Sequence, residues 1–321
     1  MSLFSYRHDR HAETGQPTIR LSAPDDRASA QVAPASGCNL LSFQVEGTEY
    51  IFARPAASVL KLLGTPILYP MPNRVRNGQF TFEGRTFTFP TNMGGHFIHG
   101  LVRDQAWQVD EPVASEDSIA CTARIRFAPD TDLYKLFPIQ NTLEVTYTLK
   151  ADSLRMGWRV QNDDKQQRLP FGLAIHPYFP IIGPRESARI QVPASKWMEA
   201  VNLMPTGRLM DLSDGPANLR QPVSLAALNL DDVFWGMQSD APATIYYDSI
   251  GKTLTLGADD WFTHVVVYTP QGQPYFCIEN QSCSTDAHNL YTQGLQKAAH
   301  LSILEPGQTF ATWLEWRVAS Q

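Results

Sequence analysis

Short segments of alternating polar and apolar residues, divided by turn-forming residues, constrain the fold of this chain most strongly. The clearest is Gln79–Phe89, where phenylalanines recur at every second position on both sides of Glu83-Gly84-Arg85. A period of two points successive side chains to opposite faces of a strand, and glycine supplies the positive φ of a tight turn. The segment therefore predicts a β-hairpin.

Similar strand-like segments recur along the chain, namely Ala120–Phe127, Asn141–Leu149, Arg155–Gln161, Thr244–Tyr247 and Thr253–Leu256. Helical periodicity is weak, and only Ser58–Leu63 and Leu225–Leu228 favour a short helical turn. With 23 prolines as breakers, the pattern predicts an all-β fold, a large antiparallel β-sandwich with few short helices.

The chain has 321 residues, 43% of them hydrophobic, which is enough to build a large core. Because the composition does not shift along the chain, we expect a single domain over residues 17–321 behind a flexible tail of residues 1–16. The tail lacks the apolar middle of a secretory signal, and no apolar run reaches the roughly 20 residues of a membrane helix. We therefore expect a cytoplasmic protein without a membrane partner.

Charge and cysteine content exclude several classes of protein. The net charge is −6 and the basic residues are not concentrated, so nothing indicates a nucleic-acid partner. No glycine-rich phosphate loop links a strand to a helix, which argues against a nucleotide-binding fold. The spacing of the four cysteines fits neither a disulfide scaffold nor a structural zinc site, so we expect buried free thiols.

Polar side chains with catalytic chemistry occur in three strand-like, apolar settings. His176 follows the apolar segment FGLAI, Glu279 ends the run Tyr275–Ile278, and Asn73-Arg74 precedes a pair of histidines. A carboxylate and an imidazole at the ends of buried strands are candidates for a base and an acid that work together. Taken singly, each has an ordinary alternative, since His176 can be a core histidine and Glu279 an ion-pair partner.

The pair of histidines, His96 and His99 in HFIHG, also has the composition of a metal site. No third ligand is evident nearby, and no glutamate stands at the spacing of a zinc protease. We therefore expect no metal.

Five motifs in order along the chain resemble the aldose 1-epimerase, or galactose mutarotase, family. They span about two thirds of the chain and are NRVRNGQFTFEGRTFTFPTN from Asn73, His99-Gly100, HPYF at His176–Phe179, LDDVF at Leu230–Phe234, and FCIENQSCSTDAHN at Phe276–Asn289. Each motif is weak alone, but their order and spacing form a specific signal. The resemblance implies the β-supersandwich of that family, with a sugar bound in an open cleft.

The resemblance also implies roles for individual residues. Glu279 corresponds to the catalytic base of the family and His176 to its catalytic acid. The substrate-binding residues that it implies are Arg74, Asn73, His99, Asp231 and Tyr178. The implied partner is a monosaccharide, bound without a cofactor, and we expect a monomer or a homodimer.

Anomer exchange fits this set of residues chemically. Opening of the pyranose needs a base at the C1 hydroxyl and an acid at the ring oxygen, and closure on the other face reverses the two roles. Glutamate, with an ordinary pKa of about 4.3, and histidine, with one of about 6.5, can exchange a proton in this way at neutral pH.

Two positions depart from the family pattern. A glutamine that many members carry on a late strand has no clear counterpart near Val265–Tyr268, where His264 is the nearest polar residue. Ile175 stands where many members have asparagine. These two departures leave the identity of the bound sugar undetermined by the sequence.

Three alternatives remain at the level of sequence. A hexose-6-phosphate epimerase would need a cationic cluster, for which Arg74, Arg76, Arg103 and Arg185 are available. A glycoside hydrolase or lyase would usually pair two carboxylates rather than a carboxylate and an imidazole. A sugar-binding or sensor protein would keep the hydroxyl-binding groups without turnover.

Overall fold

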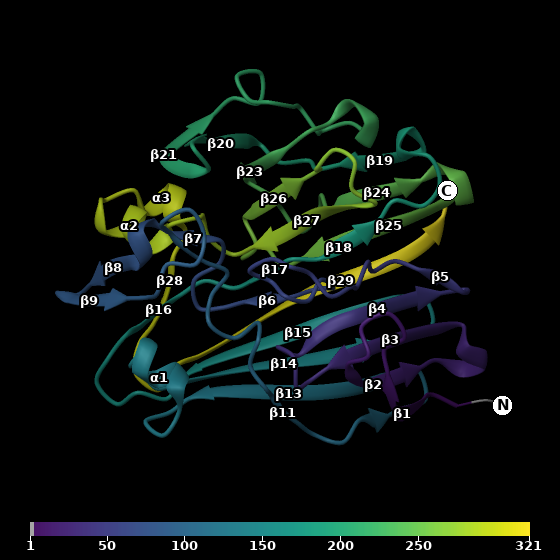
Figure 1. Cartoon of the computed structure of the whole chain (residues 1–321), viewed down its shortest axis with the longest axis horizontal. Helices are drawn as coiled ribbons and strands as arrows, with labels where there is room; N and C mark the ends of the chain where they lie inside the picture. The colour runs from purple at the N-terminus through teal and green to yellow at the C-terminus, as the bar shows by residue number, and fades with distance from the viewer. Residues whose placement is uncertain (1–2) are drawn as a thin grey trace.

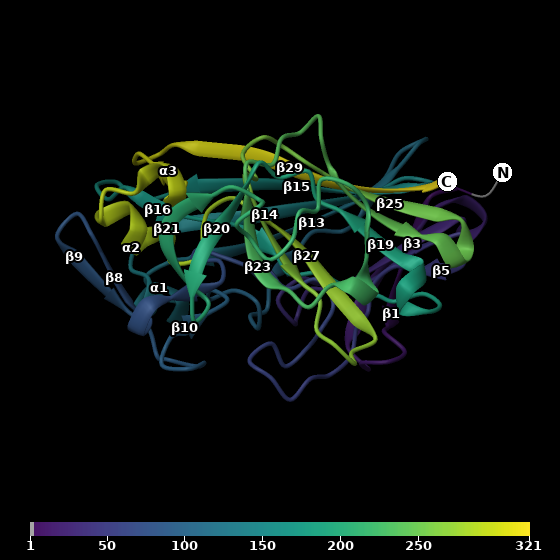
Figure 2. The same ribbon diagram turned by 90° about the horizontal axis from the view of Figure 1, so that it is seen from above.

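The computed structural model describes residues 3–321 and contains two large antiparallel sheets that pack face to face (Figures 1 and 2). The ten-stranded sheet has the order β11 (Gln108–Val109), β13 (Ile119–Phe127), β14 (Asn141–Leu149), β15 (Ser153–Asn162), β29 (Thr309–Ser320), β25 (Lys252–Ala258), β24 (Ala243–Tyr247), β19 (Ala188–Gln191) and β22 (Val223–Ser224), with β12 (Val113–Ala114) beside β13. The eight-stranded sheet has the order β21 (Met204–Met210), β20 (Lys196–Val201), β23 (Asp231–Trp235), β26 (His264–Tyr268), β27 (Tyr275–Gln281), β17 (Ala174–Ile175) and β6 (Ile67–Leu68), with β18 (Tyr178–Pro180) beside β27.

Smaller elements complete the structure. A five-stranded sheet lies at the N-terminal end in the order β1 (Ser5–Arg10), β2 (Pro17–Ser22), β3 (Ala28–Ala33), β4 (Asn39–Val45) and β5 (Thr48–Glu49). Three strand pairs are β7 (Arg74–Val75) with β10 (Phe97–Ile98), β8 (Gln79–Phe82) with β9 (Arg85–Thr88), and β16 (Leu169–Phe171) with β28 (Ser302–Leu304). The α-helices are α1 (Asp132–Leu136), α2 (Ala287–Thr292) and α3 (Gln296–Ala299). Within residues 3–321, no helix is long and apolar enough to span a membrane.

The core lies between the two large sheets because alternate side chains of each strand face the opposite layer. Phe276 on β27 contacts Phe179 on β18, with ring centroids 5.8 Å apart, and Phe179 in turn contacts Trp316 on β29 at 5.4 Å. In Figure 2, β29 runs along the upper edge of the view and β27 lies below it. The intervening residues of β27, which include Glu279, therefore point away from this core.

The all-β prediction is confirmed, and the strand segments occur within two residues of their predicted ends, including the hairpin β8–β9. Leu225–Ala227 forms the predicted turn of helix, here a 3-10 turn. Ser58–Leu63 does not form a helix, because the loop is folded back by a bridge between Pro55 and Leu62. All four cysteines are buried and free, as predicted.

The N-terminal residues differ from the expected tail over residues 1–16. Ser5–Arg10 forms β1, which pairs antiparallel with β2 over its whole length. The alternating sequence SYRHDR is too polar to bury a face, so composition gave no indication of this edge strand. The extent of one domain over residues 17–321 stays a prediction.

Candidate active site

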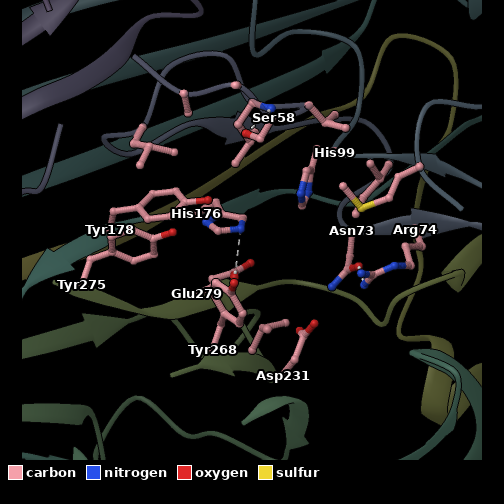
Figure 3. Close-up of a pocket in the computed structure, with 18 residues that line it drawn as sticks. Ser58, Asn73, Arg74, His99, His176, Tyr178, Asp231, Tyr268, Tyr275 and Glu279 are labelled. Carbon is pink, nitrogen blue, oxygen red and sulfur yellow. Dashed lines mark hydrogen bonds and ion pairs between the residues drawn. The ribbon is translucent and has the colours of Figure 1, made fainter. Parts of the chain in front are cut away.

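All seven residues that the sequence singled out line one pocket, with a cavity volume of about 340 Å³. They are Asn73, Arg74, His99, His176, Tyr178, Asp231 and Glu279 (Figure 3). A pocket of this size lies within the range of about 300–1,000 Å³ that is usual for small-molecule sites. The alternation of β27 places this pocket on the face of the eight-stranded sheet that is turned away from the core.

His176 and Glu279 form a buried pair in the middle of the pocket. The Nε2 atom of His176 lies 3.2 Å from Oε1 of Glu279, and their side chains are only 8% and 3% exposed. The backbone N–H of His176 donates to the carbonyl of Pro66, and Gln281 Nε2 donates to the other carboxyl oxygen of Glu279 at 3.4 Å. Gln281 and His176 therefore hold the carboxyl group of Glu279 before any ligand arrives, whereas Nδ1 of His176 has no partner among the described residues.

Burial opposes charge on both members of this pair. It lowers the pKa of His176 to about 4, and the cation of Arg74 adds to that effect. It raises the pKa of Glu279 well above its ordinary value, with a further increase from Asp231 that Gln281 and Arg74 partly offset. A carboxyl and an imidazole in contact under these conditions share one dissociable proton. The pair is thus poised to take up one proton as it gives up another.

Asn73, Arg74 and His99 form a polar group on one side of the pair (Figure 3). Asn73 and His99 both have positive φ, at 54° and 70°, and the N–H of His99 donates to the carbonyl of Asn73 at 2.8 Å. Arg74 Nη1 donates to Asn73 Oδ1 at 3.1 Å, which fixes the amide orientation. The turns beside the short β7–β10 pair therefore aim three hydrogen-bonding side chains into the pocket.

His99 is neutral in this setting. Burial lowers the pKa of its imidazole well below the ordinary value, and the nearby His176, Arg103 and Arg74 act in the same direction. Its Nδ1 is buried and has no partner among the described residues. A neutral imidazole has one donor and one acceptor nitrogen, so an unpartnered nitrogen can form a hydrogen bond with a hydroxyl group of a ligand.

Arg103 supports His99 from behind, a role that sequence reasoning missed. Its side chain is 11% exposed, and Nη1 donates to the carbonyls of Ile98, His99 and Gly100 at 3.0, 3.1 and 2.9 Å. One guanidinium nitrogen thus ties three successive carbonyls of the turn. In the sequence, only its position four residues after His99 could have indicated this role of Arg103.

Asp231 lines the same side of the pocket as Arg74 and is exposed (Figure 3). The walls of the pocket partly desolvate it, which raises the pKa of its carboxyl, while Arg74 lowers it. The neighbouring Asp232 instead accepts a hydrogen bond from Nε1 of Trp197 at 3.0 Å. Only the first acid of the Asp-Asp pair is therefore available to a ligand.

An aromatic wall closes the other side of the pair (Figure 3). The Tyr178 ring stacks on that of His176, with centroids 4.8 Å apart and an interplanar angle of 16°, and Tyr275 meets Tyr178 edge-on at 5.0 Å. Tyr268 and Tyr275 also line the pocket but were not predicted. Tyr268 lies two residues after Val266 on β26, and Tyr275 lies four residues before Glu279 on β27, so each shares the pocket face of its strand. This even spacing identifies both tyrosines once the strands are known. The loop residues Ala56–Leu60, which also line the pocket, carried no such signal.

The four arginines considered as a phosphate site do not converge. Arg74 is the only one that lines the pocket. Arg76 pairs with Asp286 at 3.3 Å, Arg103 binds the carbonyls described above, and Arg185 donates to the carbonyls of Leu225, Gln273 and Thr269.

His96 and His264 lie outside the residues that line the pocket. His96 Nδ1 accepts the N–H of Asn77 at 3.2 Å. His264 is fully buried, with Nε2 3.1 Å from the carbonyl of Ala298. Neither replaces the glutamine that the family pattern places on a late strand. Gln281, which pairs with His264 in register, is instead the amide that contacts Glu279.

One group in the described part of the chain has donor atoms close enough to hold a metal ion. His176, Cys277 and Glu279 each offer one ligand atom, and these atoms lie within 4.8 Å of one another. The expected pair of His96 and His99 is not part of it.

Known proteins resemble this chain in both sequence and fold. The uncharacterized protein YihR of Escherichia coli (strain K12) is 25% identical over 276 residues, which cover 85% of this chain and 86% of that protein. The galactose mutarotase of Sus scrofa is 27% identical over 158 residues, 48% of this chain and 44% of its own length.

Solved structures extend the likeness to the whole fold. A galactose mutarotase-like protein from Clostridium acetobutylicum superposes with a TM-score of 0.85 at 18% identity and covers 99% of both chains. The galactose 1-epimerase of Lactobacillus acidophilus NCFM gives a TM-score of 0.77 at 18% identity, covering 100% of this chain and 99% of that one. The sequence model of the family described as aldose 1-epimerase matches residues 17–317. The chain therefore belongs to the aldose 1-epimerase family.

Proposed function

We propose that this protein is an aldose 1-epimerase that interconverts the α and β anomers of a hexose. The observation that carries the proposal is the buried contact of 3.2 Å between His176 and Glu279, inside a pocket walled by hydrogen-bonding groups. An acid and a base held at this separation can act on two oxygens attached to the same carbon.

The proposed mechanism starts from the form of the pair in which the shared proton lies on His176 and Glu279 is ionised. Glu279 then accepts the proton of the C1 hydroxyl while His176 donates its proton to the ring oxygen. The bond between C1 and the ring oxygen breaks, so that C5 carries a hydroxyl group and C1 becomes an aldehyde. Rotation about C1–C2 exposes the other face of the aldehyde, and the reverse transfers close the ring. The pair holds one dissociable proton before and after each step, so the cycle needs neither solvent protons nor a cofactor.

The polar side of the pocket is proposed to bind the remaining hydroxyl groups. Arg74 and Asn73 supply N–H donors, Asp231 supplies an acceptor, and neutral His99 supplies either. The aromatic ring of Tyr178, stacked on His176, fixes the imidazole plane and offers an apolar surface to the sugar. A polar edge opposite an aromatic face suits a pyranose, which has both.

The arrangement favours a free sugar over a hexose 6-phosphate. A phosphate needs convergent cations, and the pocket contains Arg74 together with two carboxyl groups, Asp231 and Glu279. Arg76, Arg103 and Arg185 are engaged elsewhere. The pocket therefore has no surplus of positive charge.

Anomer exchange measured by NMR or polarimetry tests the proposal, with α-D-glucose, α-D-galactose and glucose 6-phosphate as substrates. We expect Glu279→Gln and His176→Asn each to lower the rate about 10²- to 10⁴-fold, the usual contribution of a placed acid or base. Circular dichroism should show that both variants keep the fold. A wild-type rate in Glu279→Gln would rule out its role as base, and release of reducing sugar from an oligosaccharide would favour a hydrolase instead.

A further inference from the structure

Cys277 is a chemically reactive side chain that the proposed mechanism does not use. It stands two residues before Glu279 on β27, so both side chains lie on the pocket-facing side of the strand. It is fully buried beneath the aromatic wall, in a cluster with Leu60, Leu63 and Tyr178. Within residues 3–321 no hydrogen bond engages its thiol.

The thiol completes a set of metal ligands with the proposed catalytic pair. Imidazole nitrogen, thiolate sulfur and carboxylate oxygen are the three donors that Zn²⁺ prefers. The donor atoms of His176, Cys277 and Glu279 lie within 4.8 Å of one another, and the imidazole and carboxylate are already 3.2 Å apart. Ligand atoms around tetrahedral zinc are roughly 3.5 Å apart, given metal–ligand distances of about 2.0–2.3 Å. A shift of roughly 1 Å, within reach of side-chain rotation, closes the site.

Charge balance allows a divalent cation at this depth. A thiolate, a carboxylate and a neutral imidazole carry two negative charges in total, which a divalent cation neutralises. Burial of the complex therefore leaves no net charge, whereas burial of an unpaired ion is very costly. The thiol proton and the proton shared by His176 and Glu279 leave to solvent when the metal binds.

We propose that His176, Cys277 and Glu279 together bind a thiophilic divalent cation such as Zn²⁺. Because two of these ligands are the proposed catalytic pair, the bound cation is an inhibitor. The open fourth position of the metal faces the pocket, where water or a sugar hydroxyl can occupy it. Metal binding removes both the acid and the base, so inhibition follows if the proposed epimerase mechanism holds. Hard cations such as Mg²⁺ require mainly oxygen ligands and do not fit a site with a single carboxylate.

Binding is tested first without reference to activity. Cd²⁺ is added to the purified metal-free protein, and the ultraviolet charge-transfer band of a Cd²⁺–thiolate bond is recorded. We expect one equivalent in wild type and loss of the band in Cys277→Ala. The matched control is Cys283→Ala, which removes an equally buried free thiol that packs on Gly172 outside the pocket and should leave the band unchanged. An undiminished band in Cys277→Ala, or none in wild type, would refute the site.

Inhibition is tested in the anomer-exchange assay with Zn²⁺ and with Mg²⁺. Zn²⁺ should inhibit wild type and Cys283→Ala, and Mg²⁺ should not. The inhibition constant for Zn²⁺ should rise at least about 10-fold in Cys277→Ala, a loss that even outer-shell changes cause at zinc sites. Equal inhibition of Cys277→Ala contradicts the proposal. A Cys277-dependent cadmium band in a protein that exchanges no anomers leaves the metal site standing and refutes the proposed function.

Discussion

Asp231 and Asp232 are neighbours in β23, but the strand gives them different surroundings. Asp231 lines the pocket, whereas Asp232 accepts the indole N–H of Trp197 on β20. Successive side chains of a strand point to opposite faces, which accounts for the separation. The two carboxylates therefore provide a matched pair of substitutions, one in the proposed binding site and one outside it.

We expect Asp231→Ala to lower kcat/KM for the sugar about 10- to 100-fold, because a hydrogen bond to a charged group contributes about 1.5–3 kcal/mol. The free energy of unfolding should change little, since Asp231 is exposed. Asp232→Ala should show the reverse, with a loss of about 1 kcal/mol in stability and an unchanged kcat/KM. Denaturant unfolding and NMR exchange kinetics measure the two effects. Equal kinetic losses in both variants would contradict the assignment of Asp231 to the sugar site.

Sequence motifs identified the seven pocket residues because each is fixed by its own short motif. The residues that sequence reasoning missed depend on relations between strands. Tyr268 enters the pocket because β26 pairs with β27 so that Tyr268 lies opposite Cys277. Arg103 acts through backbone carbonyls, which no side-chain pattern reveals.

The turn from Ile98 to Arg103 is the element that sets the position of His99. His99 has φ 70° and Gly100 φ 63°, so two successive residues adopt the left-handed region. A Cβ at Gly100 would lie 2.5 Å from the carbonyl oxygen of Tyr69, which leaves room only for glycine. Arg103 then binds the carbonyls that this unusual path exposes.

Arg103→Met should therefore raise KM for the sugar about 10-fold, because His99 loses its fixed orientation, in addition to a loss of about 1–3 kcal/mol in stability from unpaired carbonyls. Arg185→Met is the matched control, since Arg185 also donates to three carbonyls but lies outside the residues that line the pocket. It should lower stability and leave KM unchanged. Arg103→Lys, which restores a cationic donor, should recover part of the lost affinity. If the two methionine variants changed KM equally, Arg103 would have no specific effect on the site.

Regular strands were predictable as elements, whereas the three α-helices of the described chain were not. β14 alternates buried and partly buried residues over its whole length, and its predicted bounds are correct. The helix α1 spans five residues after Thr131, whose hydroxyl accepts the N–H of Tyr134, so a cap was its only signal. The helix α2 starts after Asp286 at φ 57°, a conformation imposed by tertiary contacts such as the ion pair with Arg76. Ser58–Leu63 is not helical because the bridge between Pro55 and Leu62 folds this loop back, so that Ser58, Leu60 and Leu63 line the pocket.

Over the whole molecule, the sandwich buries several histidines away from water. Burial lowers the pKa of His264 to about 3 and that of His288 to about 4, as it does for His176. A histidine whose folded pKa lies below its unfolded pKa of about 6.5 binds fewer protons in the folded state. Stability from such a group is complete above pH 6.5 and is lost as the pH falls towards its folded pKa. Buried carboxyl groups with a raised pKa, such as Glu279, instead stabilise the fold more as the pH falls. The contribution of one histidine is therefore obtained from the difference between wild type and a variant that lacks it.

We expect wild type to lose about 2 kcal/mol of unfolding free energy for His264 alone between pH 7 and pH 5, because one pKa unit corresponds to about 1.4 kcal/mol. His264→Asn cannot take up that proton, so its loss over the same pH range should be smaller by about 2 kcal/mol, even though the variant is less stable overall. Urea unfolding of both proteins at the two pH values gives the difference directly. His288→Asn should show a change of the same sign, since its imidazole is also buried, 3.3 Å from the carbonyl of Pro170. Parallel pH profiles for wild type and His264→Asn would mean that His264 is protonated in the folded protein at pH 5, and burial would then not control its charge.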